Sequence, residues 1–260
     1  MITFSIVTIT YNAEKMLQPT LDSVLMQRYE HIEHIIVDGA STDDTLSLAS
    51  DYKRRSDEAE NGHIITVVSE PDKGLYDAMN KGLQRASGDY VCFLNAGDRL
   101  PEQDTLEKIV RTAEDSGDGD MPAVLYGDTD IIDEMGTFVR HRRLAPPDKL
   151  TWRSFRQGMV VCHQAFYAAT DIAKTIPYDL QYRHSADVDW CICVMKEAEK
   201  QQKKLVRVPA VLAHYLQGGD SVVHHKASLR ERFQVMRKHY GIITTIGMHL
   251  WFVIRKWVVR

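Results

Sequence analysis

The chain of 260 residues carries 32 Lys and Arg against 36 Asp and Glu, a formal net charge of −4 with the two signs well mixed. Its length is sufficient to bury a sizeable core without disulfides or structural metals, and its charge excludes an electrostatic nucleic-acid binder. The four cysteines lack the spacing of a disulfide framework or a zinc site, which predicts reduced thiols and a cytoplasmic protein.

The first hundred residues alternate between strand-like apolar runs and helical spacing. Asn12 is expected to be the N-cap of the first helix, and Pro19 is expected to delay or kink that helix. The alternation predicts a parallel, doubly wound α/β sheet with helices on both faces. In chain order, the predicted elements are strand 3–10, helix 13–27, strand 33–37, loop 38–44 with a helix after it, strand 64–69, helix 75–85 and strand 90–94.

Each predicted strand ends in a loop rich in Asp, Asn, Gly, Ser or Thr. Because parallel strands end at one edge of a sheet, four such loops predict a nucleotide or sugar-phosphate pocket there. The last loop, Asn95-Ala96-Gly97-Asp98, places a carboxylate where it can bind a divalent cation, although Asp98 can equally be a turn former. No GxGxxG follows the first strand and no GxxxxGK[ST] is present, which excludes a common NAD-binding fold and a P-loop protein.

The second half predicts a helix at 102–114, a surface loop at 115–122, and a strand with a hairpin at 123–142. Ser185 is expected to cap a helix. Asp187 then lies at the helix start facing the pocket, while Asp189 points elsewhere. The remaining predicted elements are an edge strand at 205–208, a loop at 214–221 and an amphipathic helix ending near 240.

Five ordered sequence blocks stand out: Thr10-Tyr11-Asn12, Asp38 to Asp43, Asp72 to Gly82, Ala86-x-Gly88 and Asn95 to Asp98. They resemble the successive blocks of the inverting family 2 glycosyltransferases of GT-A fold. The resemblance is dense over the first hundred residues and thinner to about residue 225, and it is strongest to small bacterial enzymes of capsular or exopolysaccharide synthesis, such as those of the colanic acid cluster. It implies a GT-A domain at 1–225, with a nucleotide-sugar half to about 122 and an acceptor half at 123–225, and a helical extension at 226–260. The resemblance also implies that His163 and Gln164 lie on a strand near the acceptor, and that the loop at 214–221 closes over the diphosphate of the donor.

The resemblance implies roles in donor binding for the loops of the first half. Thr10, Tyr11 and Asn12 would flank the nucleotide base. Asp38 would accept a hydrogen bond from the base, and Lys73 would lie near the base or the diphosphate; the alternatives are a turn-forming Asp38 and a solvated Lys73. The full implied donor set is Thr10, Tyr11, Asn12, Asp38, Ser41, Asp72, Lys73, Gly74, Asn80, Asn95, Ala96 and Gly97.

Metal and catalytic roles are implied for a few acidic residues. The family often has Asp-x-Asp where this chain keeps only Asp98, so Asp98 is the implied principal ligand of Mg²⁺ or Mn²⁺. Asn95 adds at most a neutral oxygen, and His214 can add a metal or phosphate contact. Asp187 is the implied general base, with Asp189 in reserve.

The implied activity is transfer of a sugar from a nucleoside diphosphate-sugar, UDP-linked by preference, to an acceptor hydroxyl with inversion. The acceptor would be a saccharide or a lipid-diphosphate-saccharide in bacterial surface polysaccharide assembly. Two alternatives remain open. A sugar-phosphate nucleotidyltransferase would need a Gly-rich basic loop where TYNAEK stands, and a non-catalytic nucleotide-sugar binding or scaffold protein would keep the pocket without turnover.

The segment 242–260 differs in composition from the rest of the chain. Its apolar stretch is too short, and its basic pair at 255–256 too central, for a comfortable membrane span. As a helix it has Thr245, His249, Lys256 and Arg260 on one side, and on the other Ile243, Ile246, Leu250, Ile254, Trp257 and Val258. Such a helix can lie on the inner face of the cytoplasmic membrane. The alternative is packing onto the catalytic domain or onto a second subunit in a homodimer.

Overall fold

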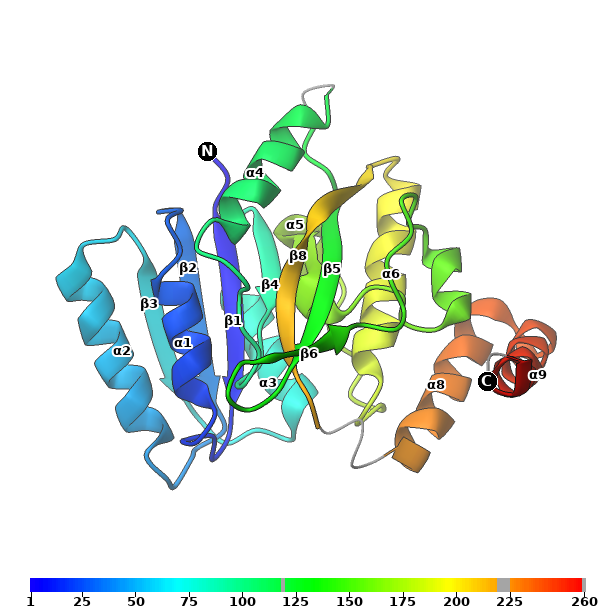
Figure 1. Ribbon diagram of the computed structural model, residues 1–260, viewed down its shortest axis with the longest axis horizontal. Helices are drawn as coiled ribbons and strands as arrows, with labels where there is room; N and C mark the ends of the chain where they lie inside the picture. The colour runs from blue at the N-terminus through cyan, green and yellow to red at the C-terminus, as the bar shows by residue number, and fades with distance from the viewer. Residues whose placement is uncertain (118–119, 219–224, 259–260) are drawn as a thin grey trace.

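The computed structural model describes residues 1–117, 120–218 and 225–258, and within these an eight-stranded sheet forms the centre of the molecule (Figure 1). Its strand order is β3-β2-β1-β4-β7-β5-β6, and β8 pairs with β5. The first four strands are all parallel, which confirms the predicted alternation. They are β1 (Phe4–Thr10), β2 (Ile32–Asp38), β3 (Ile64–Ser69) and β4 (Tyr90–Phe93).

The second half of the sheet is mixed. β7 (Phe166–Ala169) runs antiparallel to both β4 and β5 (Val124–Ile132), and β6 (Phe138–His141) forms the predicted hairpin with β5. β8 (Leu205–Leu216) is parallel to β5 and far longer than the predicted strand at 205–208. The prediction stopped at Pro209, which lacks a backbone N–H; the strand accommodates it at an interruption of the β5–β8 register.

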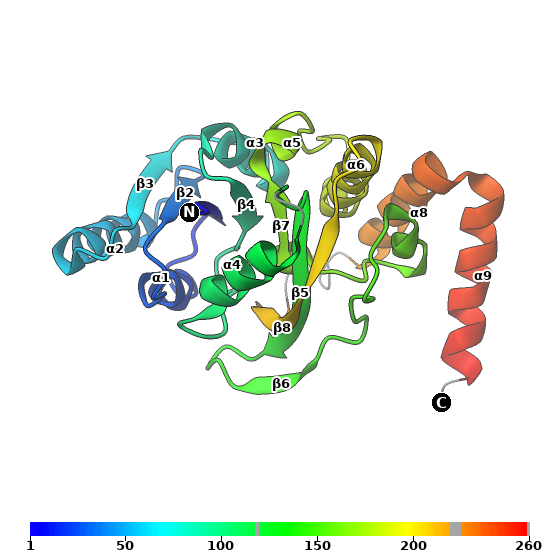
Figure 2. The same ribbon diagram turned by 90° about the horizontal axis from the view of Figure 1, so that it is seen from above.

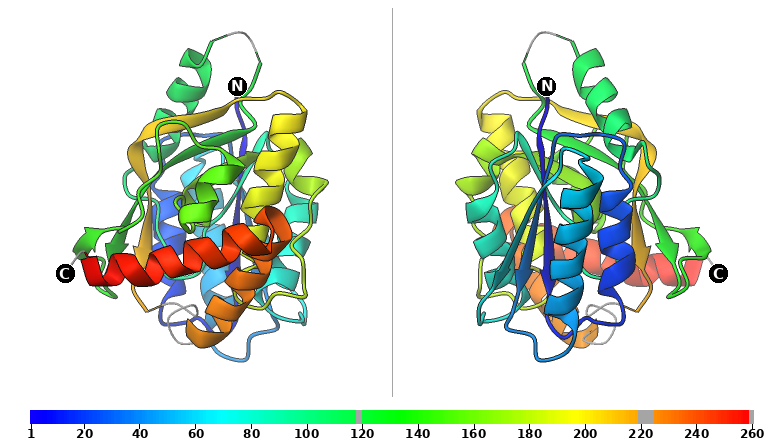
Figure 3. Two further views of the ribbon diagram at one scale, coloured as in Figure 1. Left: turned by 90° about the vertical axis from the view of Figure 1, so that its right-hand side faces the viewer. Right: turned by 90° about the vertical axis from the view of Figure 1, so that its left-hand side faces the viewer.

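Helices cover both faces of the sheet (Figures 2 and 3). Every residue of β1 and β4 is buried, as expected of parallel strands covered on both sides. One face carries α1 (Leu17–Leu25), α2 (Thr45–Ala59) and α4 (Thr105–Asp115), and the other carries α3 (Leu75–Arg85), α5 (Thr170–Lys174) and α6 (Ala186–Lys200).

Three local predictions were wrong. α1 begins at Leu17 rather than 13, and Asn12 is not its N-cap but lies outside the helix with φ 47°. Pro19 falls in the first turn, where its missing N–H leaves no hydrogen bond unmade, which explains the delayed start. His163 and Gln164 lie in a 3-10 turn, η2 (His163–Ala165), before β7 rather than in a strand.

Ser185 occupies the N-cap position of α6 without a capping hydrogen bond, so the predicted cap chemistry is absent although the helix boundary is confirmed. Its hydroxyl instead donates to the Ser228 carbonyl oxygen over 3.3 Å. The helix start is held by contact with α8 rather than by its own first turn.

Two helices complete the chain, α8 (His225–Tyr240) and α9 (Ile242–Val258), joined at Gly241 with φ 79°. They lie at the end of the molecule opposite α2, next to α6 and the 3-10 helix η1 (Trp152–Gln157) (Figures 1 and 2). No helix among the described residues is long and apolar enough to cross a membrane. The expected domain boundary at 225 adjoins residues 219–224, which lie outside the described residues.

Candidate active site

Asp187 lies in the first turn of α6, with its side chain 16% exposed. Its Oδ2 is 3.2 Å from His163 Nδ1, and its Oδ1 accepts a hydrogen bond of 3.1 Å from the Tyr76 hydroxyl on α3. Burial alone would raise the pKa of Asp187, but the hydrogen bond from His163, together with the charge of Arg232, holds that pKa below its usual value. Asp187 is therefore ionised at neutral pH and able to accept a proton.

His163 links Asp187 to the loop after β4. Its Nε2 is 3.3 Å from the Asn95 side-chain nitrogen, which can only donate, so Nε2 accepts and Nδ1–H donates to Asp187. The sequence pattern did not assign His163 or Tyr76 to the site. The Cys162-His163-Gln164 block was a signal for the first, and the Asp72 to Gly82 block, which contains Tyr76, was a signal for the second.

Asp98 is 4% exposed, and both of its carboxylate oxygens accept hydrogen bonds. Gln164 Nε2 donates to Oδ2 over 2.7 Å, and the Leu216 backbone N–H at the end of β8 donates to Oδ1 over 3.0 Å. Burial raises the pKa of Asp98 to about 6, against the lowering effect of these two hydrogen bonds. This carboxyl is poised to change charge near neutral pH.

Asn95 and Asp98 belong to one tight turn, closed by a hydrogen bond of 3.0 Å from Asp98 N to the Asn95 carbonyl oxygen. The side-chain oxygen of Asn95 is buried and has no hydrogen-bond partner among the described residues. Each Asp98 oxygen accepts one hydrogen bond and keeps a further lone pair. These hard oxygen donors suit Mg²⁺ or Mn²⁺, so the turn fits the implied metal.

Asp38, at the end of β2, is fully buried and organises the loop that follows it. It accepts hydrogen bonds from Ser41 N over 2.9 Å, from the Ser41 hydroxyl, and from the Ser69 hydroxyl over 2.7 Å. The Asn12 side chain reaches the same loop by accepting from Thr42 N over 2.9 Å. The loops after β1, β2 and β3 therefore meet at one edge of the sheet, as predicted.

The remaining donor candidates differ in exposure. The Thr10 hydroxyl is buried without a partner in the described part of the chain, whereas Tyr11 is 64% exposed. Asp72 accepts from Gly74 N over 2.7 Å at the start of α3, beside the exposed Lys73. Ala96 and Gly97 continue the Asn95 turn, and the N–H of Gly97 donates to the Thr20 hydroxyl over 2.8 Å.

Asn80 makes two hydrogen bonds with the backbone of one residue. Its side-chain nitrogen donates to the Tyr178 carbonyl oxygen over 3.0 Å, and its oxygen accepts from Tyr178 N over 2.7 Å. Both ends of this amide hold α3 to the segment before α6. The geometry thus gives Asn80 a bracing role at the edge of the site.

His214 lies within β8, not in a loop as expected, and its backbone pairs with Arg99 over 2.9 and 3.0 Å. Burial, then the charge of Arg99, lowers its pKa, while Asp130 and Glu102 act in the opposite direction. Of the expected loop at 214–221, residues 219–221 lie outside the described residues.

Asp189 faces α8 instead of the Asp187 site. Its oxygens contact Lys238 Nζ at 3.0 Å and His239 Nε2 at 2.7 Å. Burial opposes ionisation, but these partners lower the pKa of Asp189. The predicted divergence of Asp187 and Asp189 is confirmed.

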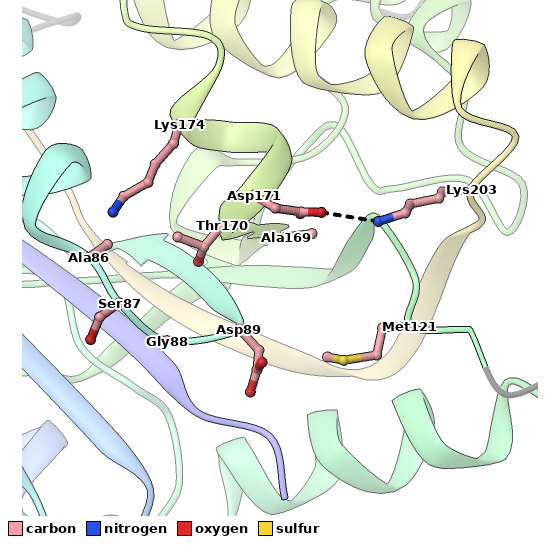
Figure 4. A pocket seen from close by; sticks show the side chains of 10 residues that line it. All are labelled: Ala86, Ser87, Gly88, Asp89, Met121, Ala169, Thr170, Asp171, Lys174 and Lys203. Carbon is pink, nitrogen blue, oxygen red and sulfur yellow. Dashed lines mark hydrogen bonds and ion pairs between the residues drawn. The ribbon is translucent and has the colours of Figure 1, made fainter.

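A recess of about 430 Å³ lies at the amino end of β4, on the edge opposite Asp98 (Figure 4). An ion pair of 3.3 Å joins Asp171 and Lys203 across it. Its position separates it from the converging loops described above. The lining residues are Ala86, Ser87, Gly88, Asp89, Met121, Ala169, Thr170, Asp171, Lys174 and Lys203.

Comparisons with known proteins agree with this geometry. The family described as "Glycosyl transferase family 2" matches residues 5–170. A PGL/p-HBAD biosynthesis glycosyltransferase of Mycobacterium tuberculosis is 35% identical over 190 residues, which cover 73% of this chain and 68% of the relative. The amylovoran biosynthesis glycosyltransferase AmsB of Erwinia amylovora is 31% identical over 220 residues, covering 82% of this chain and 69% of AmsB.

Solved structures share the fold. TarS 1-349 of S. aureus in complex with UDP-GlcNAc has a TM-score of 0.69 at 19% identity, covering 90% of this chain. This chain spans only 64% of that TarS chain. The mannosyltransferase PcManGT of Pyrobaculum calidifontis, in complex with GDP-Man and Mn²⁺, has a TM-score of 0.59 at 18% identity, covering 95% of this chain and 74% of its own. The shared architecture is that of GT-A enzymes.

Proposed function

Since the chain belongs to glycosyl transferase family 2, we propose that it transfers a sugar from a nucleoside diphosphate-sugar to an acceptor hydroxyl with inversion at the anomeric carbon. One observation carries the proposal. Asp187 is an ionised carboxylate, held by His163 and Tyr76, and His163 joins it to the Asn95–Asp98 turn at the carboxyl edge of the sheet. A base and a diphosphate-binding turn are thus adjacent.

The donor nucleotide would bind across the ends of β1 to β3. Tyr11 offers an exposed ring for stacking on the base, and Asp38 keeps lone pairs that can accept from a base N–H. We assign UDP as the preferred nucleotide; TarS binds UDP-GlcNAc and PcManGT binds GDP-Man, so both nucleotides belong in the test. Lys73 is exposed beside this edge and free to approach the diphosphate.

Asp98 and Asn95 would hold Mg²⁺ or Mn²⁺, and the metal would supply positive charge to the departing diphosphate. Because the turn has a single carboxylate, the affinity of the site for the metal would depend strongly on the diphosphate of the bound donor. Gln164 and Leu216 N keep the Asp98 carboxylate in one orientation. We retain His214 as a secondary contact to be tested.

In the proposed reaction, the acceptor hydroxyl oxygen forms a bond to the anomeric carbon, and its proton passes to Asp187. The bond between the anomeric carbon and the diphosphate oxygen breaks, and the nucleoside diphosphate leaves with the bonding pair. This single displacement inverts the anomeric configuration. His163 and Tyr76 hold the carboxylate in place as it takes the proton.

The names of the relatives, in amylovoran and PGL/p-HBAD biosynthesis, support a role in bacterial glycan or glycolipid assembly. The acceptor would then be a saccharide, free or carried on a lipid diphosphate. Membership of the family removes the nucleotidyltransferase interpretation. A binding protein without turnover remains the competing interpretation.

The deciding experiment measures nucleotide release from UDP-, GDP- and dTDP-sugars, with Mn²⁺ or with EDTA, followed by NMR of the product anomer. Release from one donor with an inverted product supports the proposal. A retained configuration would exclude single displacement. Donor binding without release across a panel of saccharide and lipid-diphosphate acceptors would favour the binding protein.

A further inference from the structure

The helix α9 presents apolar side chains on two opposite sides. Residues 241–254 include no Asp, Glu, Lys or Arg. With about 100° between successive residues of a helix, Thr245, Met248, His249 and Phe252 share one side. On that side Thr245 is fully buried and the His249 ring contacts Phe233 at 5.1 Å, so it packs against the protein.

The opposite side of α9 is open to solvent. It carries four large aliphatic side chains, each 48 to 86% exposed, which together form what we call the α9 apolar face: Ile243, Ile246, Leu250 and Ile254. Trp251, at the edge of this face, is 53% exposed. The more polar side of the helix is therefore the packed one, and the structure excludes packing of this face onto the chain's own described residues. A contiguous exposed apolar surface of this kind marks an interaction site.

The charge of the surrounding segment indicates what covers the face. Residues 226–260 contain eight Lys and Arg and one Glu, a net charge of +7. The whole chain carries −4, so residues 1–225 carry −11. Lys226, Arg230 and Arg237 of α8 are exposed. Positive charge is thus concentrated in the segment that exposes the apolar face.

A basic recess of about 390 Å³ adjoins α9, between this helix and η1. It is lined by Thr151, Arg153, Ser154, Arg156, Gln157 and Met248. Arg153 is paired with Glu199 at 2.8 Å, but Arg156 has a buried Nε with no partner within the described ranges. Because Met248 is on the packed side of α9, this recess lies behind the helix, away from the α9 apolar face.

We propose that α9 lies in the plane of a membrane surface rich in anionic phospholipid. The α9 apolar face would enter the boundary between head groups and acyl chains, and the exposed basic residues of α8 would contact the head groups. With 17 residues, α9 is about 25 Å long, which suits a helix lying along the surface. A symmetric pair of α9 helices from two copies would instead bring two segments of +7 together.

The test is co-sedimentation of the full-length chain with phosphatidylcholine vesicles that contain or lack about a third of phosphatidylglycerol. We expect binding to the anionic vesicles only, weakening as salt is added. The affinity of the variant Ile243→Ser/Ile246→Ser/Leu250→Ser for the anionic vesicles should fall by about tenfold or more, since the apolar area is lost. The matched control is Ile64→Ser, because Ile64 is 66% exposed on β3 at the other end of the molecule.

Three outcomes overturn the proposal: no binding to either vesicle, equal binding to neutral and anionic vesicles, or equal binding by the triple variant and the wild type. A dimer that forms without vesicle binding and dissociates in the triple variant would assign the face to a second copy. Circular dichroism verifies that the variants are folded. Because the readout is sedimentation, this inference stands or falls separately from the proposed sugar transfer.

Discussion

The side-chain amide of Gln164 donates a hydrogen bond of 2.7 Å to Asp98. Its neighbour His163 reaches Asp187 at 3.2 Å from the same 3-10 turn. Two adjacent residues thus hold the proposed metal ligand and the proposed base. Because η2 is short and leads directly into the buried strand β7, the two carboxylates are fixed relative to each other, as a displacement reaction requires.

Substitution of each α6 carboxylate in turn distinguishes the role of Asp187 from that of Asp189. Asp187→Asn should lower kcat by about 10² to 10⁴-fold with little change in donor affinity, since general base catalysis contributes that much. Asp189→Asn is the matched control. It should lower stability by about 2 kcal/mol through the loss of the Lys238 and His239 contacts, with kcat retained. Steady-state kinetics and thermal unfolding distinguish the two, and the reverse pattern would make Asp189 the base.

Removing His163 should change the pH dependence of the reaction. The His163 hydrogen bond lowers the pKa of Asp187, so in His163→Leu burial dominates and that pKa rises. The base is then protonated over a wider acidic range, and the acid limb of the kcat/KM profile moves to higher pH. His163→Gln, which can still donate, should move it less. An unchanged limb with a lower kcat would assign His163 another role.

Asp98 should be required for metal-dependent turnover. Asp98→Ala removes the only carboxylate of the Asn95–Asp98 turn, so we expect about a hundredfold loss of metal-stimulated activity, comparable to EDTA treatment of the wild type. Manganese titration of donor binding by calorimetry tests this directly. Full activity of the wild type in EDTA would contradict the metal assignment.

The Asp98 carboxyl should also make stability depend on pH in the direction opposite to that of a salt-bridged carboxylate, because its pKa is raised and not lowered. Its folded pKa is about 6, above the ordinary value of 3.8, so its contribution to stability is present at low pH and lost as pH rises through 6. In metal-free buffer at pH 7.5, Asp98→Asn should therefore raise the free energy of unfolding by about 1 to 2 kcal/mol, with no gain at pH 4. Urea unfolding at both pH values measures this; a loss of stability at pH 7.5 would show that the carboxylate is accommodated without cost.

A substitution of Asn80 tests whether this residue contacts the donor or instead holds α3 to Tyr178. Asn80→Ala should lower stability by about 2 kcal/mol, because two Tyr178 backbone groups lose their partners, while donor affinity changes less than about twofold. Thermal unfolding and donor titration give the two numbers. Weaker donor binding at unchanged stability would instead support the implied donor contact.

The parallel half of the sheet follows from the amino-acid sequence alone, because apolar β-branched runs and polar loops are local patterns that burial on both faces enforces. The sequence placed Asp38, Asp98 and Asp187 at the carboxyl edge, and the helical spacing of α6 separated Asp187 from Asp189. Its errors came where backbone hydrogen bonds depend on distant partners. Pro209 inside β8 and the 3-10 turn at His163 are examples.

The groups that act on each carboxylate are brought to it by long-range packing, which the sequence pattern does not show. Tyr76 reaches Asp187 across 111 positions of the chain, and Leu216 reaches Asp98 across 118. The same holds for α9, whose pattern defines two sides but whose packing against α8 selects the exposed one. Hydrogen bonding and burial act through space, so a local pattern can set the spacing of side chains along an element without setting what that element meets.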